Sequence, residues 1–259
     1  QYLMERFKSN NLKLLQICYN GKFKEKEVKV VDLEEITDTK FPDVDCITIK
    51  SDKKLIEILS DFNENIERIN SKFEVVNELQ KKGLEEAAND ILRSQIVLLM
   101  SSIDFYIHEI VKYGVIKIFN KEKARTKDYE SVIVSIECVE KAVINPESVD
   151  WLEESIIVQN KFKSFISLSK MRRALRIISN KKIMDESIRK TSTEIGMSEK
   201  VFKEKLDKLY ERRNCIVHQT DRNPLDCRIN DIRKEEVQEG ITLISKLILN
   251  IHYEIKNDI

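Results

Sequence analysis

The chain has 259 residues, enough for one large domain or two small ones with a core that needs no disulfide or metal for its stability. Its five glycines and three prolines lie far below average usage and 41% of its residues are apolar, which together predict a folded, mainly helical protein. Acidic and basic residues balance at 45 each, so the net charge by itself indicates no nucleic-acid partner.

The cysteines and the most apolar segment exclude two further classes of protein. The five cysteines are odd in number, widely spaced and without a CxxC pair, which fits neither a disulfide framework nor a zinc site. Reduced thiols in a cytoplasmic protein are the simplest interpretation. The chain begins at Gln1, and nothing there is typical of a signal peptide. The segment 91–119 carries several charged residues, so we expect a buried helix and no membrane span.

The first 51 residues differ from the rest of the chain. Asn20-Gly21 is a favoured two-residue hairpin turn between runs that could pair, and Cys46–Lys50 is a further short strand candidate. A short helix over Leu12–Tyr19, ended by Gly21, is the alternative. We therefore predict a small mixed α/β extension over 1–51 and a separate helical domain over 52–259.

Helical periodicity dominates from Asp52 onward and predicts an antiparallel helical bundle. Gly83 should separate the first helix from a long second one. Ser198 should cap the helix that ends before Pro224, and apolar residues from Val237 to Ile251 mark the inward stripe of the last helix. The expected helices cover residues 52–82, 84–119, 129–143, 151–169, 170–178, 198 to about 219–222, and a final segment around 237–251.

Charge is distributed unevenly in the middle of the chain. Residues 161–190 contain ten basic and two acidic residues, a local charge of +8, whereas 128–154 contains eight acids and one lysine, a local charge of −7. The basic segment could bind a polyanion, or the two segments could be solvated helix faces that attract each other.

The stretch ERRNCIVH, residues 211–218, concentrates side chains that can carry chemistry. On a helix, Asp207, Asn214 and His218 share one stripe. Arg213 continues the apolar run that begins at Phe202, at a position where leucine or isoleucine would be expected. A guanidinium that points inward needs an anion, so we expect Arg213 to meet a buried carboxylate or a bound phosphate.

Asp104 interrupts the apolar long helix, where a carboxylate is unfavourable unless it is paired. Arg213 and Arg93 are its candidate partners, and an ordinary buried ion pair that holds two helices together is the alternative. His108, four residues later, is expected to form a core pair with Asp104. His252 lies near the end of the last helix, where a cation interacts favourably with the helix dipole. The histidines show no metal-ligand spacing, so neither a metal nor another cofactor is expected.

The stretch DKLYERRNCIVH resembles the signature of the HEPN ribonucleases, small all-helical domains of higher eukaryotes and prokaryotes. In that family an Arg, commonly followed by a polar residue, precedes a His by four to six positions near the end of a late helix. Arg213, Asn214 and His218 fit this pattern, and Asp207 matches an acid often found before it. LLMSSIDFYIHEIV resembles the long opening helix of the prokaryotic HEPN branch, with Asp104 at its acidic position. The resemblance covers about residues 52–259.

The resemblance implies a metal-independent endoribonuclease that cleaves single-stranded RNA by attack of the 2′-OH on phosphorus. His218 would transfer a proton near neutral pH, Arg213 would stabilise phosphate charge, and Asn214 would orient the imidazole or bind phosphate. Asp207 or Asp104 would hold Arg213. The basic segment would guide the RNA backbone through its best candidates, Lys170, Arg172, Arg173 and Arg176.

The resemblance also bears on assembly. Arg213 and His218 are five residues apart, about 140° around a helix, so one straight helix cannot direct both at one phosphate. HEPN domains typically dimerise with these helices facing across a twofold axis, which implies a homodimer with a composite cleft. The prokaryotic branch further implies a toxin or anti-phage effector, with an antitoxin or defence-system partner protein. The alternative is a non-catalytic HEPN module that binds RNA or nucleotide, or mediates dimerisation with a partner protein.

Overall fold

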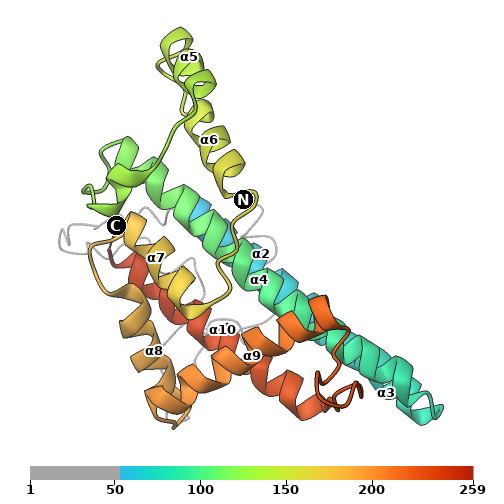
Figure 1. Ribbon diagram of the computed structural model, residues 1–259. Helices are drawn as coiled ribbons and strands as arrows, with labels where there is room; N and C mark the ends of the chain where they lie inside the picture. Colours follow the sequence, from blue (N-terminus) through green and yellow to red (C-terminus); the bar gives the residue numbers. More distant parts are fainter. Residues whose placement is uncertain (1–52, 259) are drawn as a thin grey trace, which may run out of the picture. The chain divides into compact units, whose positions relative to one another are not determined.

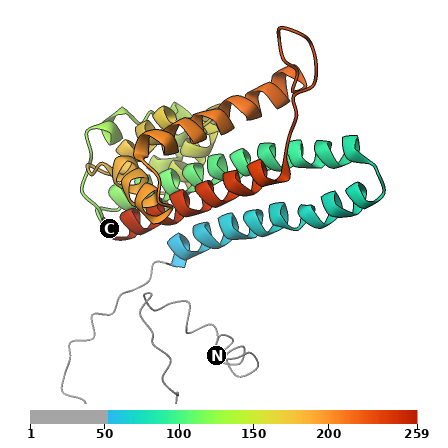
Figure 2. The same ribbon diagram turned by 90° about the horizontal axis from the view of Figure 1, so that it is seen from below.

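The computed structural model describes residues 53–258, which form an all-helical bundle (Figures 1 and 2). No strand occurs within this range, where the extended pairing is an isolated bridge between Arg222 and Ile229. The predicted hairpin at Asn20-Gly21 and the strand at Cys46–Lys50 lie outside the described residues. The elements in chain order are α2 (Lys53–Asn70), α3 (Lys72–Lys81), α4 (Glu85–Phe119), the 3-10 helix η2 (Asp128–Ser131), α5 (Ile136–Ile144), α6 (Asp150–Asn160), α7 (Leu168–Ile178), α8 (Ile183–Glu194), α9 (Glu199–Gln219) and α10 (Lys234–Lys256).

The 35-residue helix α4 is the axis of the bundle. It is apolar nearly all round because other helices cover it on several sides, with α2 and α3 along one side and α7, α9 and α10 along others. Its buried residues run from Ala88 to Ile118, almost its full length. The prediction of one long buried helix here is confirmed, and no helix within 53–258 is both long and apolar enough to cross a bilayer.

The first predicted helix, 52–82, is divided in two. Leu55, Phe62 and Ile69 of α2 are buried as their spacing predicts, but the helix stops at Asn70. Ser71, whose hydroxyl donates to the Arg68 carbonyl oxygen at 3.0 Å, lies between α2 and α3. A serine hydroxyl that bonds a backbone carbonyl oxygen competes with the helical hydrogen bonds there. The apolar periodicity of the sequence nevertheless continues across Ser71. The sequence therefore gives no signal for the break.

The middle of the chain differs most from the prediction. The expected helix 129–143 consists of η2 and α5, and the expected helix 151–169 ends at Asn160. The segment 161–167 is not helical, and α7 begins only at Leu168. Helix α8 was not predicted, although its buried Ile183, Met184, Ser187, Ile188 and Thr191 have helical spacing. Small polar residues on its inner face hide the apolar stripe.

Helices α5 and α6 form a hairpin that projects from the bundle (Figure 1). Helix α5 contacts α6, and α6 joins the hairpin to α4. Several apolar side chains on the hairpin are exposed, among them Val143 at 77% and Ile144 at 84%. Helix α5 therefore contributes little to the core, whereas Leu152 and Ile156 of α6 are part of it.

The last two helices match the prediction closely. The Ser198 hydroxyl oxygen caps α9 by accepting from the Val201 backbone N–H at 3.3 Å. Helix α9 ends at Gln219, and Thr220 adopts a left-handed conformation with φ of 51°. The predicted inward stripe of α10, from Val237 to Ile251, is buried.

Candidate functional site

The candidate catalytic side chains lie near the C-terminal end of α9. The helix is unbroken from Glu199 to Gln219, so Arg213 and His218 remain about 140° apart around its axis. His218 is exposed, while Arg213 and Asn214 are half-buried. Solvent therefore reaches the imidazole, but within one subunit it points away from the guanidinium.

Among residues 53–258, no carboxylate neutralises the charge of Arg213. Its Nη1 donates to the Asn214 side-chain oxygen at 3.1 Å, and no ion pair to Arg213 is formed by any residue in 53–258. Of the two anions expected for Arg213, a buried carboxylate or a bound phosphate, the carboxylate is therefore not found among these residues. An amide oxygen orients a guanidinium without removing its positive charge, so the group remains able to bind phosphate.

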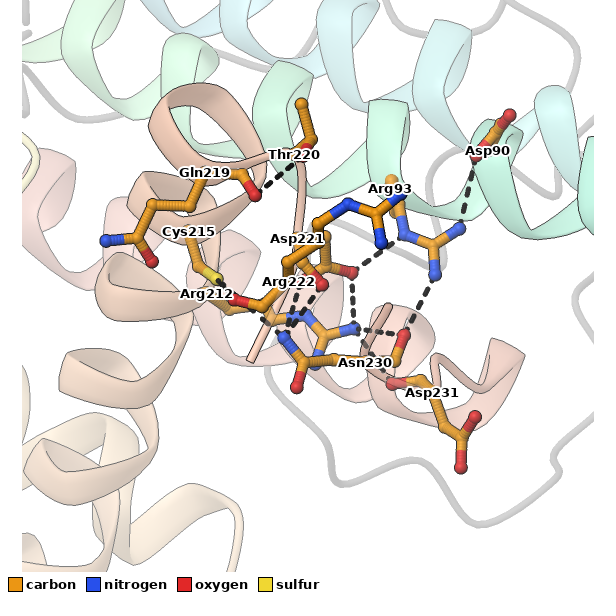
Figure 3. Close-up of polar contacts among 10 residues, drawn as sticks. All are labelled: Asp90, Arg93, Arg212, Cys215, Gln219, Thr220, Asp221, Arg222, Asn230 and Asp231. Carbon is orange, nitrogen blue, oxygen red and sulfur yellow. Dashed lines mark hydrogen bonds and ion pairs between the residues drawn. The ribbon is translucent and has the colours of Figure 1, made fainter. Parts of the chain in front are cut away.

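The arginine that meets a buried carboxylate is the preceding residue, Arg212. Its Nη2 lies 2.8 Å from Oδ2 of Asp221, and Nε of Arg93 on α4 lies 2.7 Å from the same oxygen (Figure 3). The Asp221 side chain is 1% exposed. Two cations from different helices thus converge on one carboxylate, just beyond the end of the helix that carries the motif.

Further contacts fix the loop between α9 and α10. The Asp221 backbone N–H donates to the Cys215 carbonyl oxygen at 3.0 Å, and the Asn230 backbone N–H donates to the Asp221 carbonyl oxygen at 2.8 Å. Arg93 also donates to the Asn230 carbonyl oxygen at 2.8 Å (Figure 3). The loop is therefore tied both to α9 and to α4. Asp221 was missed in the sequence because loop residues follow no periodicity.

The two acids proposed to support Arg213 lie elsewhere. Oδ1 of Asp104 accepts the Phe165 backbone N–H at 2.5 Å and lies 3.6 Å from Nε2 of His108. Asp104 and His108 therefore pair as expected, but both side chains are about a quarter exposed, so the pair lies at the edge of the core. Asp207 is exposed on α9 and forms no ion pair with Arg213. The pairings of Asp104 with Arg213 or Arg93 are wrong.

Of the four basic candidates for RNA binding on α7, two form ion pairs and two do not. Arg172 forms an ion pair with Asp185 at 2.8 Å, and Arg176 forms one with Asp128 at 3.1 Å. Lys170 and Arg173 are exposed and form no ion pair with any residue of 53–258. Both line a cavity of about 750 Å³. Arg176 and Asp128 also join the basic and acidic segments, so attraction between these segments is part of the structure.

The basic residues and the motif lie along different parts of α4. Val111 and Val115 line the cavity with Lys170 and Arg173, whereas Arg93 holds the loop that follows His218. At 1.5 Å per residue, Arg93 and Val111 are about 27 Å apart along the helix axis. Within one subunit, the sequence-predicted RNA-binding residues are therefore not adjacent to the motif.

His252 is buried in the core, away from the motif on α9. His252 is 9% exposed, and its Nδ1 lies 3.2 Å from the Tyr106 hydroxyl. Burial, with a smaller contribution from Lys256, lowers the pKa of His252 to about 4, so it is neutral and not the cation expected at this helix end. In the part of the chain that the structure describes, no group of three His, Cys, Asp or Glu side chains has the geometry of a metal site.

Comparison with known families adds one decisive observation. A family model described as RiboL-PSP-HEPN matches residues 53–257. The chain belongs to the RiboL-PSP-HEPN family. No curated protein and no solved structure shows significant similarity to it.

The match to RiboL-PSP-HEPN confirms the resemblance found in the sequence, and it covers every described helix. The all-α architecture of residues 53–258 is consistent with a HEPN fold. Membership of a HEPN family indicates a nuclease or RNA-related function in general terms.

Proposed function

We propose that this HEPN domain is a metal-independent endoribonuclease that cleaves single-stranded RNA, with Arg213 and His218 as its catalytic residues. The supporting observation is the charge state of the Arg213 surroundings: its guanidinium is oriented by the Asn214 amide oxygen and neutralised by no carboxylate within 53–258. A cation held in this way favours the phosphorane-like transition state, in which the phosphate oxygens gain negative charge.

The chemistry requires no metal because RNA supplies its own nucleophile. In the proposed reaction His218 removes the proton of the 2′-OH while water protonates the departing 5′ oxygen, or His218 protonates the 5′ oxygen while water accepts the 2′-OH proton. The 2′ oxygen attacks phosphorus, the bond to the 5′ oxygen breaks, and a 2′,3′-cyclic phosphate forms. Asn214 keeps Arg213 directed at the phosphate.

The proposed enzyme is a homodimer. Because α9 is one unbroken helix, Arg213 and His218 of one subunit diverge by about 140°. Two copies of α9 that face each other across a twofold axis would place one subunit's guanidinium near the other's imidazole. Lys170 and Arg173 are proposed to hold the RNA backbone at a distance from the cleft. Arg172 and Arg176 are weaker candidates, because each already has a carboxylate partner.

The test is cleavage of labelled single-stranded RNA in EDTA by the full chain. We expect wild type to give products that end in cyclic phosphate, His218→Ala and Arg213→Ala to lose at least 100-fold in rate, and DNA to remain uncut because it lacks the nucleophile. Arg233→Ala is the matched control, because this arginine is exposed at the start of α10 and pairs with Glu236 on the same helix turn. Its rate should equal that of wild type.

Mixing the two inactive variants tests the composite cleft. A heterodimer of His218→Ala and Arg213→Ala subunits keeps one intact guanidinium and one intact imidazole, so activity should partly return after subunit exchange. Light scattering should give twice the mass of one chain. An active monomer, or no recovery on mixing, would contradict the shared cleft. RNA binding without cleavage by wild type would leave a non-catalytic RNA-binding or dimerisation module.

The proposed biological role is that of a toxin or anti-phage effector controlled by a partner protein. It rests on the resemblance of the long helix to prokaryotic HEPN proteins of that kind. Expression of wild type in bacteria should then slow growth, whereas His218→Ala should not. Equal growth of both cultures, for a protein that is active in vitro, would argue against this role.

A further inference from the structure

The cavity beside α7 combines an apolar floor with an excess of positive charge. Val111 and Val115 of α4 and Ala174 and Ile177 of α7 form apolar parts of its lining. Its charged lining residues are four cations, Lys163, Lys170, Arg173 and Arg176, and one acid, Asp128. Because Asp128 pairs with Arg176, the other three cations face the cavity without a carboxylate partner among the described residues. An anionic ligand with an apolar or planar body fits this lining.

An aromatic ring stands at the same cavity. Phe162 is 91% exposed and lines the cavity between Lys161 and Lys163 in the sequence. The Lys161 ammonium lies 5.6 Å from the centre of its ring. A phenylalanine so exposed gains nothing from burial within its own subunit, whereas aromatic side chains among cations are the usual platforms for unpaired bases.

The segment that carries Phe162 is held in place from α4. Asp104 accepts the Phe165 backbone N–H, and Nε2 of His108 donates to the Lys163 carbonyl oxygen at 3.2 Å. The His108 and Phe165 rings pack with their centres 4.6 Å apart. The segment 161–167 is therefore anchored at Lys163 and at Phe165, close in sequence to Phe162, which lines the cavity and remains exposed.

We propose that this cavity is a subsite for single-stranded RNA, in which an unpaired base stacks on Phe162 and the adjoining phosphates bind Lys163, Lys170 and Arg173. The choice of RNA rests on the proposed function. The subsite lies away from the α9 motif, so it captures substrate and takes no part in bond cleavage. Stacking is tolerant of sequence because every base has a π face, so the subsite selects unpaired strands and not a particular sequence.

The test measures binding in a His218→Ala background, so that RNA is not consumed. Fluorescence anisotropy with a labelled 12-nucleotide oligouridylate should show about tenfold weaker binding for Phe162→Ala, while Phe162→Trp should bind as well as the parent. Lys170→Ala together with Arg173→Ala should weaken binding and make it less dependent on salt. Ile144→Ala and Lys200→Ala, exposed residues away from the cavity, should bind as the parent does.

Two results would overturn the subsite. One is unchanged oligouridylate binding by Phe162→Ala; the other is an equal loss for a labelled RNA duplex, because paired bases cannot stack on the ring. Phe162 is so exposed that the variant should fold, which circular dichroism melting checks. Failure of the proposed function looks different: wild type would bind oligouridylate through Phe162 and cleave nothing.

Discussion

Arg212 and Arg213 are adjacent on α9 and have opposite surroundings. Arg212 shares the buried Asp221 carboxylate with Arg93, whereas Arg213 has an amide partner. Asp221→Asn leaves two arginines facing a neutral group, so we expect the free energy of unfolding to fall by about 3 kcal/mol. Arg213→Ala removes no carboxylate contact and should change it by less than about 1 kcal/mol. Urea denaturation of both variants measures this difference, and equal losses would contradict it.

His252 makes stability depend on pH. Its pKa is about 4 in the folded chain and near the ordinary 6.5 when unfolded, so the unfolded state binds the proton more tightly. This contribution is fully present above pH 6.5 and is lost as the pH falls toward 4. We expect its full magnitude to be about 3 kcal/mol. Denaturation of wild type and His252→Gln at pH 7 and pH 4.5 isolates this contribution. The free energy of unfolding should fall more for wild type than for the variant between the two pH values; an equal fall in both would refute this.

The motif itself was predictable from the sequence because helical spacing is local. In the structure Arg213, Asn214 and His218 lie near the end of one helix, as predicted. Ser198 caps that helix and Gln219 ends it, also as expected. The partner of each charge was not predictable. The loop after α9 places Asp221 against Arg93 of α4, and sequence periodicity does not predict which helix a loop residue contacts.

At the scale of the elements, α4 and α7 approach closely at a glycine. A methyl group at Gly114 would lie 2.6 Å from two carbon atoms of Ile178, so Gly114→Ala must push the helices apart. We expect a loss of about 2–3 kcal/mol in the free energy of unfolding. Gly240→Ala is the matched control, because its methyl group would meet the end of a flexible leucine, Leu209, at 2.9 Å. The unfolding temperature of Gly114→Ala should lie well below that of Gly240→Ala. The reverse order would contradict the close contact between Gly114 and Ile178.

Elements with strong apolar periodicity were predicted well, and those with mixed faces were not. Helices α4 and α10 have long apolar runs or stripes, and both match. Helix α8 buries Ser187, Thr191 and Ser192 beside its isoleucines, so its inner face resembles a polar loop in sequence. The non-helical segment 161–167 follows contacts with Asp104 and His108 on α4, which are tertiary and leave no local trace.

At the scale of the whole molecule, the bundle has three surfaces with different chemical character. The end of α9 offers the catalytic candidates, the cavity beside α7 offers cations and an aromatic ring, and the α5–α6 hairpin offers exposed apolar side chains. Their order along the sequence does not reveal their separation, because α7 and α9 are close in the chain and extend along different parts of α4.

Because α4 is one unbroken helix, the distance along its axis sets a length scale for the proposed RNA substrate. The 27 Å or so between its Arg93 and Val111 positions corresponds to about eight stacked nucleotides. On the proposed function, a stacked RNA much shorter than this does not reach from the cavity to the α9 motif of the same subunit. Cleavage of oligouridylates at low concentration should therefore become more efficient with length up to roughly that size and then level off, and Phe162→Ala should flatten the curve. A dinucleotide cut as efficiently as a dodecamer would show that the two surfaces work independently.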